Sequence, residues 1–578
     1  MRLDVGKRNG RDYLTIIKSY RNEEGKPRTK HVKSLGYLDD LKKEYLDPIA
    51  HFKQVAAQMK KDEATGKSIP ISIDLDEELP QTAIGTRNFG YVLLMKIYHE
   101  LGIDKFIKSK SQYRKFGFNA NSILLLMTLS RILTPGSIRR TYENKDRYFE
   151  RFDFSDDDIY RAYDFFDGIS AELQRYVHES VRAKYGSDTS IIYYDVTNYW
   201  FEIKKPDEIR KRGLCKQRRK KPIVQMGLAM NKDGIPLHYE IFPGNTLDKE
   251  TFRTVIGGVR KNYDTGRIIA VADMGIITGD NIYYLVGLKP EKPQNGYIFS
   301  FSVRGGTNEF KEYVLNQTSY TARDGTPLTD EYDFKIKERF IARDIMVTMQ
   351  NGKKRKKKVY EKQIVFWSKK HMLKQRAERD EILKRSTDLV SNPDKYTRAT
   401  TYGAAAYVKN LEYDKSTGEV LTKKLLVLDE EKIADEESFD GYYSIVTSER
   451  YMDSDEIVST YRGLWEIEET FQLTKSDLHA RPVYVRDKAH INAHFLICFL
   501  ALIIIRLIQK CTNREYSAEK IIECLNSISC IHEMENIFLF GYRSHLSDLL
   551  GSIFDINFRK KRLLRSEIKN ISATSKLS

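Results

Sequence analysis

The chain has 578 residues, too many for a single hydrophobic core, so we expect several domains. A hydrophobic content of 41% is enough for a globular protein. The net charge of +16 favours a polyanionic partner, nucleic acid first, although charge alone fits a merely basic soluble protein equally well.

Three kinds of segment are not expected in this sequence. Its first residues contain no apolar stretch of the kind that forms a signal peptide. The longest apolar run, residues 495–505, is too short to span a bilayer and predicts a buried helix. The five cysteines have neither a CxxC pair nor the spacing of a zinc site. We therefore predict a cytoplasmic protein with no membrane contact and no structural metal cluster.

Two segments precede the first strong strand. Residues 1–82 alternate apolar and polar side chains around the turn-forming NEEGKP and then become charged, which predicts a small β-rich lead-in and a linker. Residues 83–186 have mostly helical periodicity, as in SILLLMTLSRIL. We predict that this helical region binds DNA, and a plain helical scaffold fits the pattern about as well.

Residues 187–303 consist of apolar, β-branched runs that predict buried strands. The run SIIYYDVTNYWFE contains Asp195, and RIIAVADMGI carries Asp273 at the end of its strand. Between them lies a basic loop that includes Arg218 and Arg219. These arginines are candidate contacts for a DNA backbone, with solvated charge as the alternative.

Three segments complete the chain. Residues 304–438 are highly charged, contain several short alternating strands and predict a β-rich insertion. Within it, KKRKKK follows an Asn-Gly turn, which predicts a solvated hairpin tip that could also touch phosphate. Residues 439–510 return to a buried strand and long helical segments. Residues 511–578 begin as helix and include RKKRLLR near the end, which predicts a helical, basic C-terminal region.

The segment Tyr461–Leu478, YRGLWEIEETFQLTKSDL, predicts one amphipathic helix. Beside its apolar stripe, a strip about 80° wide carries Tyr461, Trp465, Glu468 and Lys475. Glu468 is therefore expected at the rim of the buried face, beside a cation and aromatic rings. A plain surface helix does not need this arrangement, although helices of this composition occur in many proteins.

Three acids stand out as a set: Asp195, Asp273 and Glu468. Taken singly, Asp195 could pair with a buried arginine and Asp273 could cap a turn. Together, two aspartates at strand ends and one glutamate on a helix can hold two Mg²⁺ ions, because hard cations prefer carboxylate oxygen. Two such ions activate a water or a 3′-hydroxyl at a phosphodiester. The set therefore predicts an enzyme that cuts or joins nucleic acid strands.

The predicted helix resembles the signature Y-x2-R-x3-E-x6-K of DDE transposases of bacterial insertion sequences, in the insertion-sequence-four superfamily. Tyr461, Glu468 and Lys475 match it at the correct spacing. Leu464 stands where the family has arginine, and Arg462 lies about 200° away on the helical wheel, so it is no simple replacement. The two aspartate strands also resemble those of the family. The long stretch of sequence between Asp273 and Glu468 resembles that of the family branch that has a β-strand insertion before its glutamate.

The resemblance implies an α/β fold, with an RNase H-like mixed-sheet catalytic core interrupted by the β-rich insertion and flanked by helical N- and C-terminal regions. It implies that Asp195, Asp273 and Glu468 coordinate two divalent ions, Mg²⁺ or Mn²⁺. Water would free a 3′-hydroxyl at the transposon end, and that hydroxyl would attack target DNA. The implied partners are double-stranded DNA, as terminal repeats and target, and a second copy of the chain in a synaptic complex.

Further residues are candidates for DNA contact. The resemblance implies that Tyr461 and Lys475 touch phosphates near the scissile bond. Trp465 is expected to stack on DNA or, equally, to pack at an interface. Arg462 is a candidate contact on the same helix, and Arg481, just after it, is expected to hold phosphate or to cap the helix.

Three alternatives stay open at this point. A nuclease of the same fold would hydrolyse DNA without strand transfer. A DNA-binding regulator with an inactive triad would bind DNA without metal-dependent cleavage. A carboxylate-pair hydrolase acting on sugars has no support in the strong basic charge.

Overall fold

The computed structural model describes residues 1–577 apart from 22–25, 46, 65–84, 204, 214–220, 288–292, 329–330, 398–399, 402, 414–418, 422–424 and 535. The chain folds as two units. One comprises Met1–Phe166 with Ile504–Ser578, and the other comprises Asp167–Ile503. All of the acids and aromatic residues singled out above belong to the second unit.

The first unit opens with a three-stranded antiparallel sheet, β1-β2-β3, followed by two helices. Their bounds are β1 Arg2–Arg8, β2 Arg11–Arg21, β3 Pro27–Tyr37, α1 Leu38–Leu41 and α2 Pro48–Ala64. Asn9 and Gly10 join the first two strands with φ of 51° and 78°, the positive values that a two-residue hairpin turn requires. The β strands predicted near the N-terminus are therefore confirmed.

The rest of the first unit combines segments from both ends of the chain. Its helices are α3 Tyr91–Glu100, α4 Ile103–Ser111, α5 Ala120–Leu133, α6 Ile138–Glu143, η1 Lys145–Arg147, α16 Ala518–Ser527, α17 His545–Ile553 and α18 Arg565–Ser575. Its second sheet has the order β19-β18-β17-β4, with β4 Arg87–Asn88, β17 Ser529–Met534, β18 Ile537–Phe540 and β19 Arg562–Leu564. The Asn88 side-chain amide donates to the Leu525 carbonyl at 2.8 Å, which ties the C-terminal segment to this unit.

Two long helices, α7 Asp156–Tyr185 and α15 Lys488–Cys511, each contribute residues to both units. Among the described residues, α15 alone is long and apolar enough to cross a membrane by length and composition, and 94% of its apolar window is buried in the protein. Residues 495–505 lie within it, so the buried helix predicted there is confirmed.

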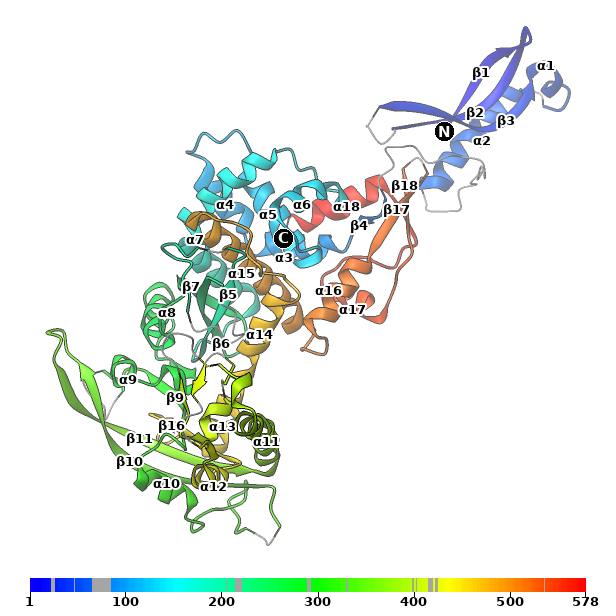
Figure 1. Ribbon diagram of the computed structural model, residues 1–578. Helices are drawn as coiled ribbons and strands as arrows, with labels where there is room; N and C mark the ends of the chain where they lie inside the picture. Colours follow the sequence, from blue (N-terminus) through cyan, green and yellow to red (C-terminus); the bar gives the residue numbers. More distant parts are fainter. Residues whose placement is uncertain are drawn as a thin grey trace. The chain divides into compact units, whose positions relative to one another are not determined.

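The second unit is built on an eight-stranded sheet of order β10-β11-β16-β9-β8-β5-β6-β7 (Figure 1). Its strands are β5 Ile191–Trp200, β6 Ile223–Asn231, β7 Pro236–Pro243, β8 Ile269–Ala272, β9 Gly296–Phe301, β10 Phe334–Thr348, β11 Lys354–Ser368 and β16 Tyr442–Thr447. The pairs β5–β8 and β8–β9 are parallel, and the other pairs are antiparallel. The sheet is thus mixed, as predicted.

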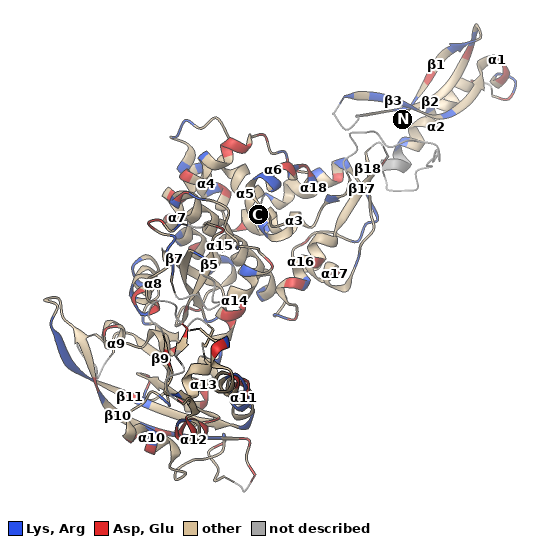
Figure 2. Ribbon diagram, viewed as in Figure 1, with Lys and Arg blue, Asp and Glu red and all other residues tan. Residues whose placement is uncertain are grey.

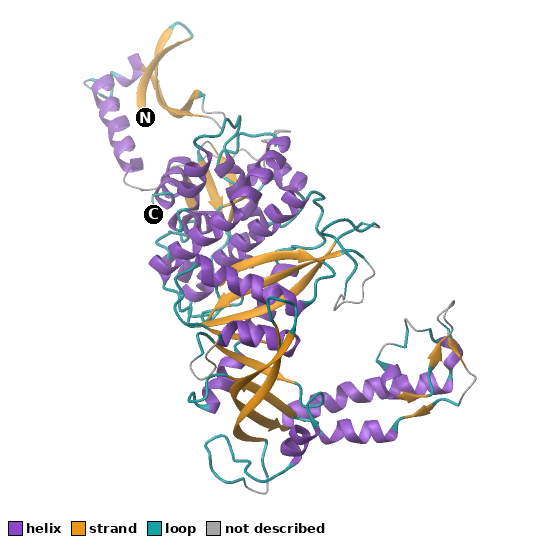
Figure 3. Cartoon of the chain, turned by 90° about the vertical axis from the view of Figure 1, so that its left-hand side faces the viewer, coloured by secondary structure: helices purple, strands orange, loops and turns teal. Residues whose placement is uncertain are grey.

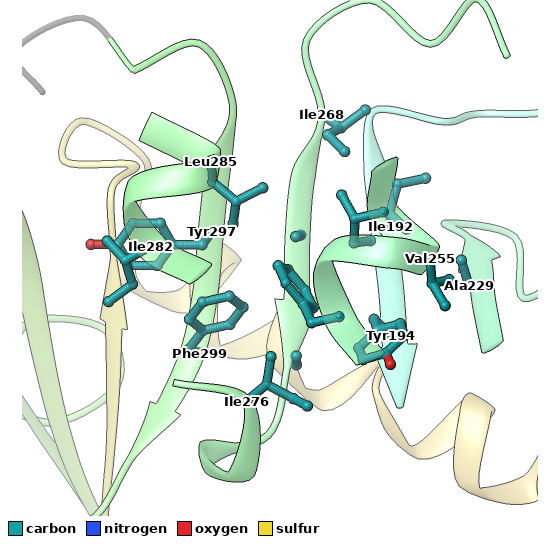
Figure 4. Close-up of a cluster of buried hydrophobic side chains, with 14 of the residues drawn as sticks. Ile192, Tyr194, Ala229, Val255, Ile268, Ile276, Ile282, Leu285, Tyr297 and Phe299 are labelled. Carbon is teal, nitrogen blue, oxygen red and sulfur yellow. The ribbon is translucent and has the colours of Figure 1, made fainter. Parts of the chain in front are cut away.

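One face of this sheet is covered by α8 (Asp248–Asn262) and α9 (Gly279–Val286). Figure 4 shows the buried side chains between the sheet and these helices, which include Tyr194, Val255 and Phe299. In strand β5, alternate side chains point into this core, so the residues between them, Asp195 among these, point to the opposite face. The core therefore fixes which face of the sheet carries the acids.

Residues 304–438 hold the long β10–β11 hairpin and further helices. The helices of this segment are α10 Asn308–Leu315, α11 Lys369–Ser391, η3 Pro393–Lys395, η4 Ala404–Tyr407 and α12 Glu430–Ser438. Figure 3 shows helices leading away from the large sheet to four short strands, β12 Val408–Lys409, β13 Glu412–Tyr413, β14 Val420–Leu421 and β15 Val427–Leu428. The short strands, α11 and η4 share a small separate core that includes Leu389 and Leu426.

The buried imidazole of His178 on α7 makes the protein sensitive to acid. Burial, aided by the charge of Arg182, lowers the pKa of His178 from 6.5 to about 4. As the pH falls below 6.5, the unfolded chain therefore binds a proton before the folded one, and stability present above pH 6.5 is lost progressively toward pH 4. We expect a loss of about 3 kcal/mol from this group over that range. Urea unfolding of wild type and His178→Gln across pH 4 to 7 measures it, and equal pH slopes would refute the assignment.

Candidate active site

Asp195 and Asp273 lie at equivalent positions on neighbouring strands. Strands β5 and β8 run parallel, with Tyr193 beside Val271. Asp195 comes two residues after Tyr193, and Asp273 two residues after Val271. Because paired strands are about 4.8 Å apart and the two-residue step restores the same face, the aspartates project side by side. Asp195 is half-buried and Asp273 is exposed.

Two hydrogen bonds fix the side chain of Asp273 at the end of β8. Its Oδ1 accepts from the Met274 backbone N–H at 2.7 Å and from the Ser300 hydroxyl on β9 at 2.6 Å. The first bond caps the short helix η2 (Met274–Ile276). The capping role weighed for Asp273 from the sequence is therefore real, and it leaves the second carboxylate oxygen, Oδ2, for other contacts.

The helical segment opposite these strands consists of two helices, so the prediction of one helix over Tyr461–Leu478 is wrong. Helix α13 spans Ser454–Arg462, and α14 spans Trp465–Lys475. Between them the backbone bonds of Leu464, Glu466 and Ile467 reach only three residues back, which makes a tight turn. The apolar stripe of α14 is nevertheless buried, as predicted.

A close packing contact places this turn against β5. A Cβ added to Gly463 would lie 2.1 Å from the hydroxyl oxygen of Tyr193. That hydroxyl donates to the Thr460 carbonyl at 3.1 Å. At the other end of α14, the Lys475 ammonium donates to the Thr197 hydroxyl. Tyr193 and Thr197 flank Asp195 on the same face of β5, so α14 runs over that aspartate.

Glu468 lies along α14 between the two contacts that hold this segment against β5. It lies between Gly463, which contacts Tyr193, and Lys475, which contacts Thr197. Its side chain is exposed, as a residue at the rim of the buried face should be. The carboxylate oxygens of the three acids do not all lie within 4.8 Å of one another among the described residues, so a shared ligand needs side-chain rotation.

Two tyrosine hydroxyls lie beside the acids. Tyr461 on α13 and Tyr443 on β16 share a hydrogen bond of 2.8 Å, and the Tyr461 hydroxyl donates to Asp273 Oδ1 at 3.5 Å. Burial, with the neighbouring Tyr443 next, raises the pKa of Tyr461 far above its usual value. Burial also raises the pKa of Tyr443, and the charges of Asp273 and Glu468 add to the increase. Both phenols therefore stay protonated at neutral pH, and Glu468 is within electrostatic reach of Tyr443.

The other predicted DNA-contact residues have different positions. Trp465 is 56% exposed at the start of α14, and Arg462 is exposed at the end of α13. Arg481 is half-buried in the loop after α14, where Val483 N–H donates to the Trp200 carbonyl at 3.4 Å. Arg218 and Arg219 lie outside the described residues.

Three residues that contact the acids or their neighbours are not among those predicted from the sequence: Ser300, Tyr443 and Thr197. Thr197 follows Asp195 by two residues, so strand alternation could have placed it on the same face. Ser300 is a polar residue inside the apolar strand YIFSF, which is a weaker signal. Tyr443 has no distinguishing feature among the tyrosines of the sequence, because its role depends on the pairing of β16 with β9.

Comparison with known protein families gives two matches. The model described as IS1634 family transposase, N-terminal domain, matches residues 4–68. The model described as Transposase DDE domain matches residues 200–504, more than half of the chain. The second match contains Asp273 and Glu468 and begins five residues after Asp195. No curated protein matches the chain.

Proposed function

The chain belongs to the transposases with a DDE domain, and from this premise we propose that Asp195, Asp273 and Glu468 are its catalytic acids. Proteins of this family cleave DNA strands and transfer them into a target. The RNase H-like core expected from the sequence is confirmed by the family match and agrees with the mixed sheet. Assignment to the branch with a β-strand insertion stays a prediction.

The observation that supports the proposal is that two of the acids lie on one face of the sheet and the third lies on a helix that packs against that face. Asp195 and Asp273 project side by side from β5 and β8, and Glu468 lies on the helix that packs against β5. Two independent sets of contacts support this arrangement. The strand register places the two aspartates, and the contacts of Tyr193 and Lys475 place the helix.

A DDE domain depends in general on a divalent metal, and we propose that the ions here are two Mg²⁺ or Mn²⁺. Two aspartates on neighbouring parallel strands and a glutamate on the helix beside them are a suitable donor set, because hard divalent cations take oxygen ligands. When bound, such ions supply a deprotonated attacking oxygen and neutralise the leaving oxygen.

The chain's own residues position the reacting groups. Ser300 and the Met274 N–H hold one oxygen of Asp273, which directs the other toward the site. Tyr461 keeps its proton, and by releasing Asp273 Oδ1 it can donate a hydrogen bond to a phosphate oxygen instead. Lys475, held over Thr197, adds a positive charge beside Asp195. We propose Trp465, Arg462 and Arg481 as further contacts with DNA.

Transposases of these families bind DNA, and we propose that the partners are the terminal repeats and the target duplex. A second copy of the chain is proposed to complete the synaptic complex, in the cytoplasm at the nucleoid. The helical region of residues 83–186 is the proposed DNA-binding region, and the insertion of residues 304–438 is proposed to separate the two parts of the core.

The test uses purified protein, Mg²⁺ and a plasmid that carries the coding sequence with its flanking DNA on both sides. We expect cleavage at the ends of the element and joined products in a second plasmid, both lost with a chelator. Cleavage without joined product would favour a nuclease of the same fold. Binding without cleavage in any divalent metal would favour an inactive regulator.

A further inference from the structure

A row of lysines lies on one face of the β10–β11 hairpin. Lys354, Lys356 and Lys358 alternate along β11 and are exposed. Figure 2 shows the basic colouring along this strand where the hairpin extends from the sheet. Within the described part of the chain, the row has one ion pair, from Lys356 Nζ to Asp344 Oδ2 at 3.8 Å, and Lys356 is 74% exposed. Most of this positive charge is therefore not neutralised by the protein.

The lysine row lies on the same face of the sheet as the candidate active site. Directly paired residues of antiparallel strands point to the same face. Tyr443 pairs with Phe366, and Ile445 pairs with both Ile364 and Ser300. Every second residue of a strand points to the same face, so Ile364 shares its face of β11 with Lys362, Tyr360 and then Lys358, the first lysine of the row. The hydroxyl of Ser300, which contacts Asp273, thus marks the same face.

The opposite face of the hairpin is occupied by protein. Val347, Ile345 and Val359 belong to the core beneath α8 and α9. The Thr348 N–H donates to Asp280 Oδ1 on α9 at 2.6 Å. A Cβ on Gly279 would lie 2.1 Å from the Met346 carbonyl oxygen, so the helix sits directly on β10. The hairpin is therefore held in place, with its lysine-bearing face outward.

Aromatic and basic residues continue this outward face toward the loop before α13. The Arg450 guanidinium lies 5.8 Å from the ring of Tyr360 and 5.5 Å from that of Tyr451, which is 92% exposed. On the adjacent strand, Phe340 is 61% exposed and Met346 50% exposed. A basic surface interleaved with exposed aromatic side chains fits a nucleic acid as its partner better than it fits an acidic protein.

We propose that Lys354, Lys356 and Lys358 form a surface that binds the phosphate backbone of duplex DNA flanking the bond that the acids cleave. This inference rests on the proposed function of the acids for its substrate. The row spans about 14 Å, over which one strand of duplex DNA presents about four phosphates. Along the sheet its nearest lysine, Lys358, lies on the order of 20 Å from the level of Ser300, about six base pairs of duplex.

The test compares two double variants that remove the same charge from opposite faces of one strand. Lys356→Gln with Lys358→Gln alters the outward face. Arg355→Gln with Lys357→Gln alters the face toward α9, where Lys357 lies 5.9 Å from the Tyr283 ring. Binding of the full-length protein to a duplex oligonucleotide of random sequence is measured over a range of salt concentrations. We expect the outward pair to reduce the slope of log K against log salt by about 1.8, and the other pair to leave it nearly unchanged.

Equal slope changes in the two variants, or none in either, would overturn the inference. An effect on a duplex RNA probe without one on DNA would also overturn it. Thermal unfolding shows whether both variants fold. Repeating the binding measurement in a Glu468→Gln background separates this surface from catalysis, because a failure of the proposed chemistry would remove cleavage without changing either slope.

Discussion

Replacing any one of Asp195, Asp273 or Glu468 by its amide is expected to slow DNA cleavage by about 10³-fold or more while DNA binding persists. Metal-assisted charge stabilisation is worth several kcal/mol, and each 1.4 kcal/mol is a factor of ten in rate. Folding should survive, because the amide oxygen of Asp273→Asn can still accept from Ser300 and the Met274 N–H. Single-turnover cleavage of an end-bearing DNA measures the loss.

The matched control is Glu456→Gln, which removes the same charge from an exposed acid in the first turn of α13. It should cleave at the wild-type rate. An amide variant of one of the three acids that also keeps the wild-type rate would remove that residue from the active site.

Replacing Asp273 by cysteine distinguishes a metal-binding role of its side chain from other roles. Thiolate prefers softer ions than carboxylate does, so Asp273→Cys should be inactive with Mg²⁺ and partly active with Mn²⁺. Equal inactivity in both metals, with a normally folded protein, would indicate that Asp273 acts chiefly through its hydrogen bonds to Ser300 and Met274.

Local pattern was sufficient to predict the strands that carry the two aspartates. Apolar, β-branched runs around Asp195 and before Asp273 became β5 and β8, both largely buried. Their side-by-side placement depends on parallel pairing between segments far apart in sequence. No local periodicity encodes that pairing, so the sequence could suggest the set of acids but not their register.

The single predicted helix failed for a physical reason. A turn whose backbone hydrogen bonds reach three residues back keeps nearly helical backbone angles. The helical spacing of apolar residues in the sequence therefore continues through Gly463 and Leu464 without a visible break. The separation into α13 and α14 depends on the approach of Gly463 to the Tyr193 hydroxyl. A glycine inside a helical pattern gives only a weak warning of such a contact.

The role of the β10–β11 hairpin was also only partly predictable. Its alternating strands and Asn-Gly turn were evident from the sequence, and both strands are present. Its pairing with β16, which puts the lysine row on the face of the acids, is again a long-range contact. The same run of cations could have been a solvated tip on either face.

Gly463→Ala is expected to reduce cleavage by about 10²-fold and to destabilise the protein by about 1–3 kcal/mol. The added Cβ would lie 2.1 Å from the Tyr193 hydroxyl oxygen and 2.6 Å from its ring carbon Cζ. Tyr193 is only 4% exposed and cannot swing away, so the turn between α13 and α14 has to move off β5. Glu468 lies five residues along and moves with it. Cleavage rate and thermal unfolding together measure the effect.

The control is Gly275→Ala, two residues after Asp273, where an added Cβ meets nothing within 4 Å. It should keep both stability and cleavage. Because the lysine row lies on β11, away from the turn, Gly463→Ala should also keep the wild-type salt dependence of DNA binding. Wild-type cleavage by Gly463→Ala would mean that Glu468 does not depend on this contact for its position. The packing of the turn against β5 would then have no part in bringing the three acids together.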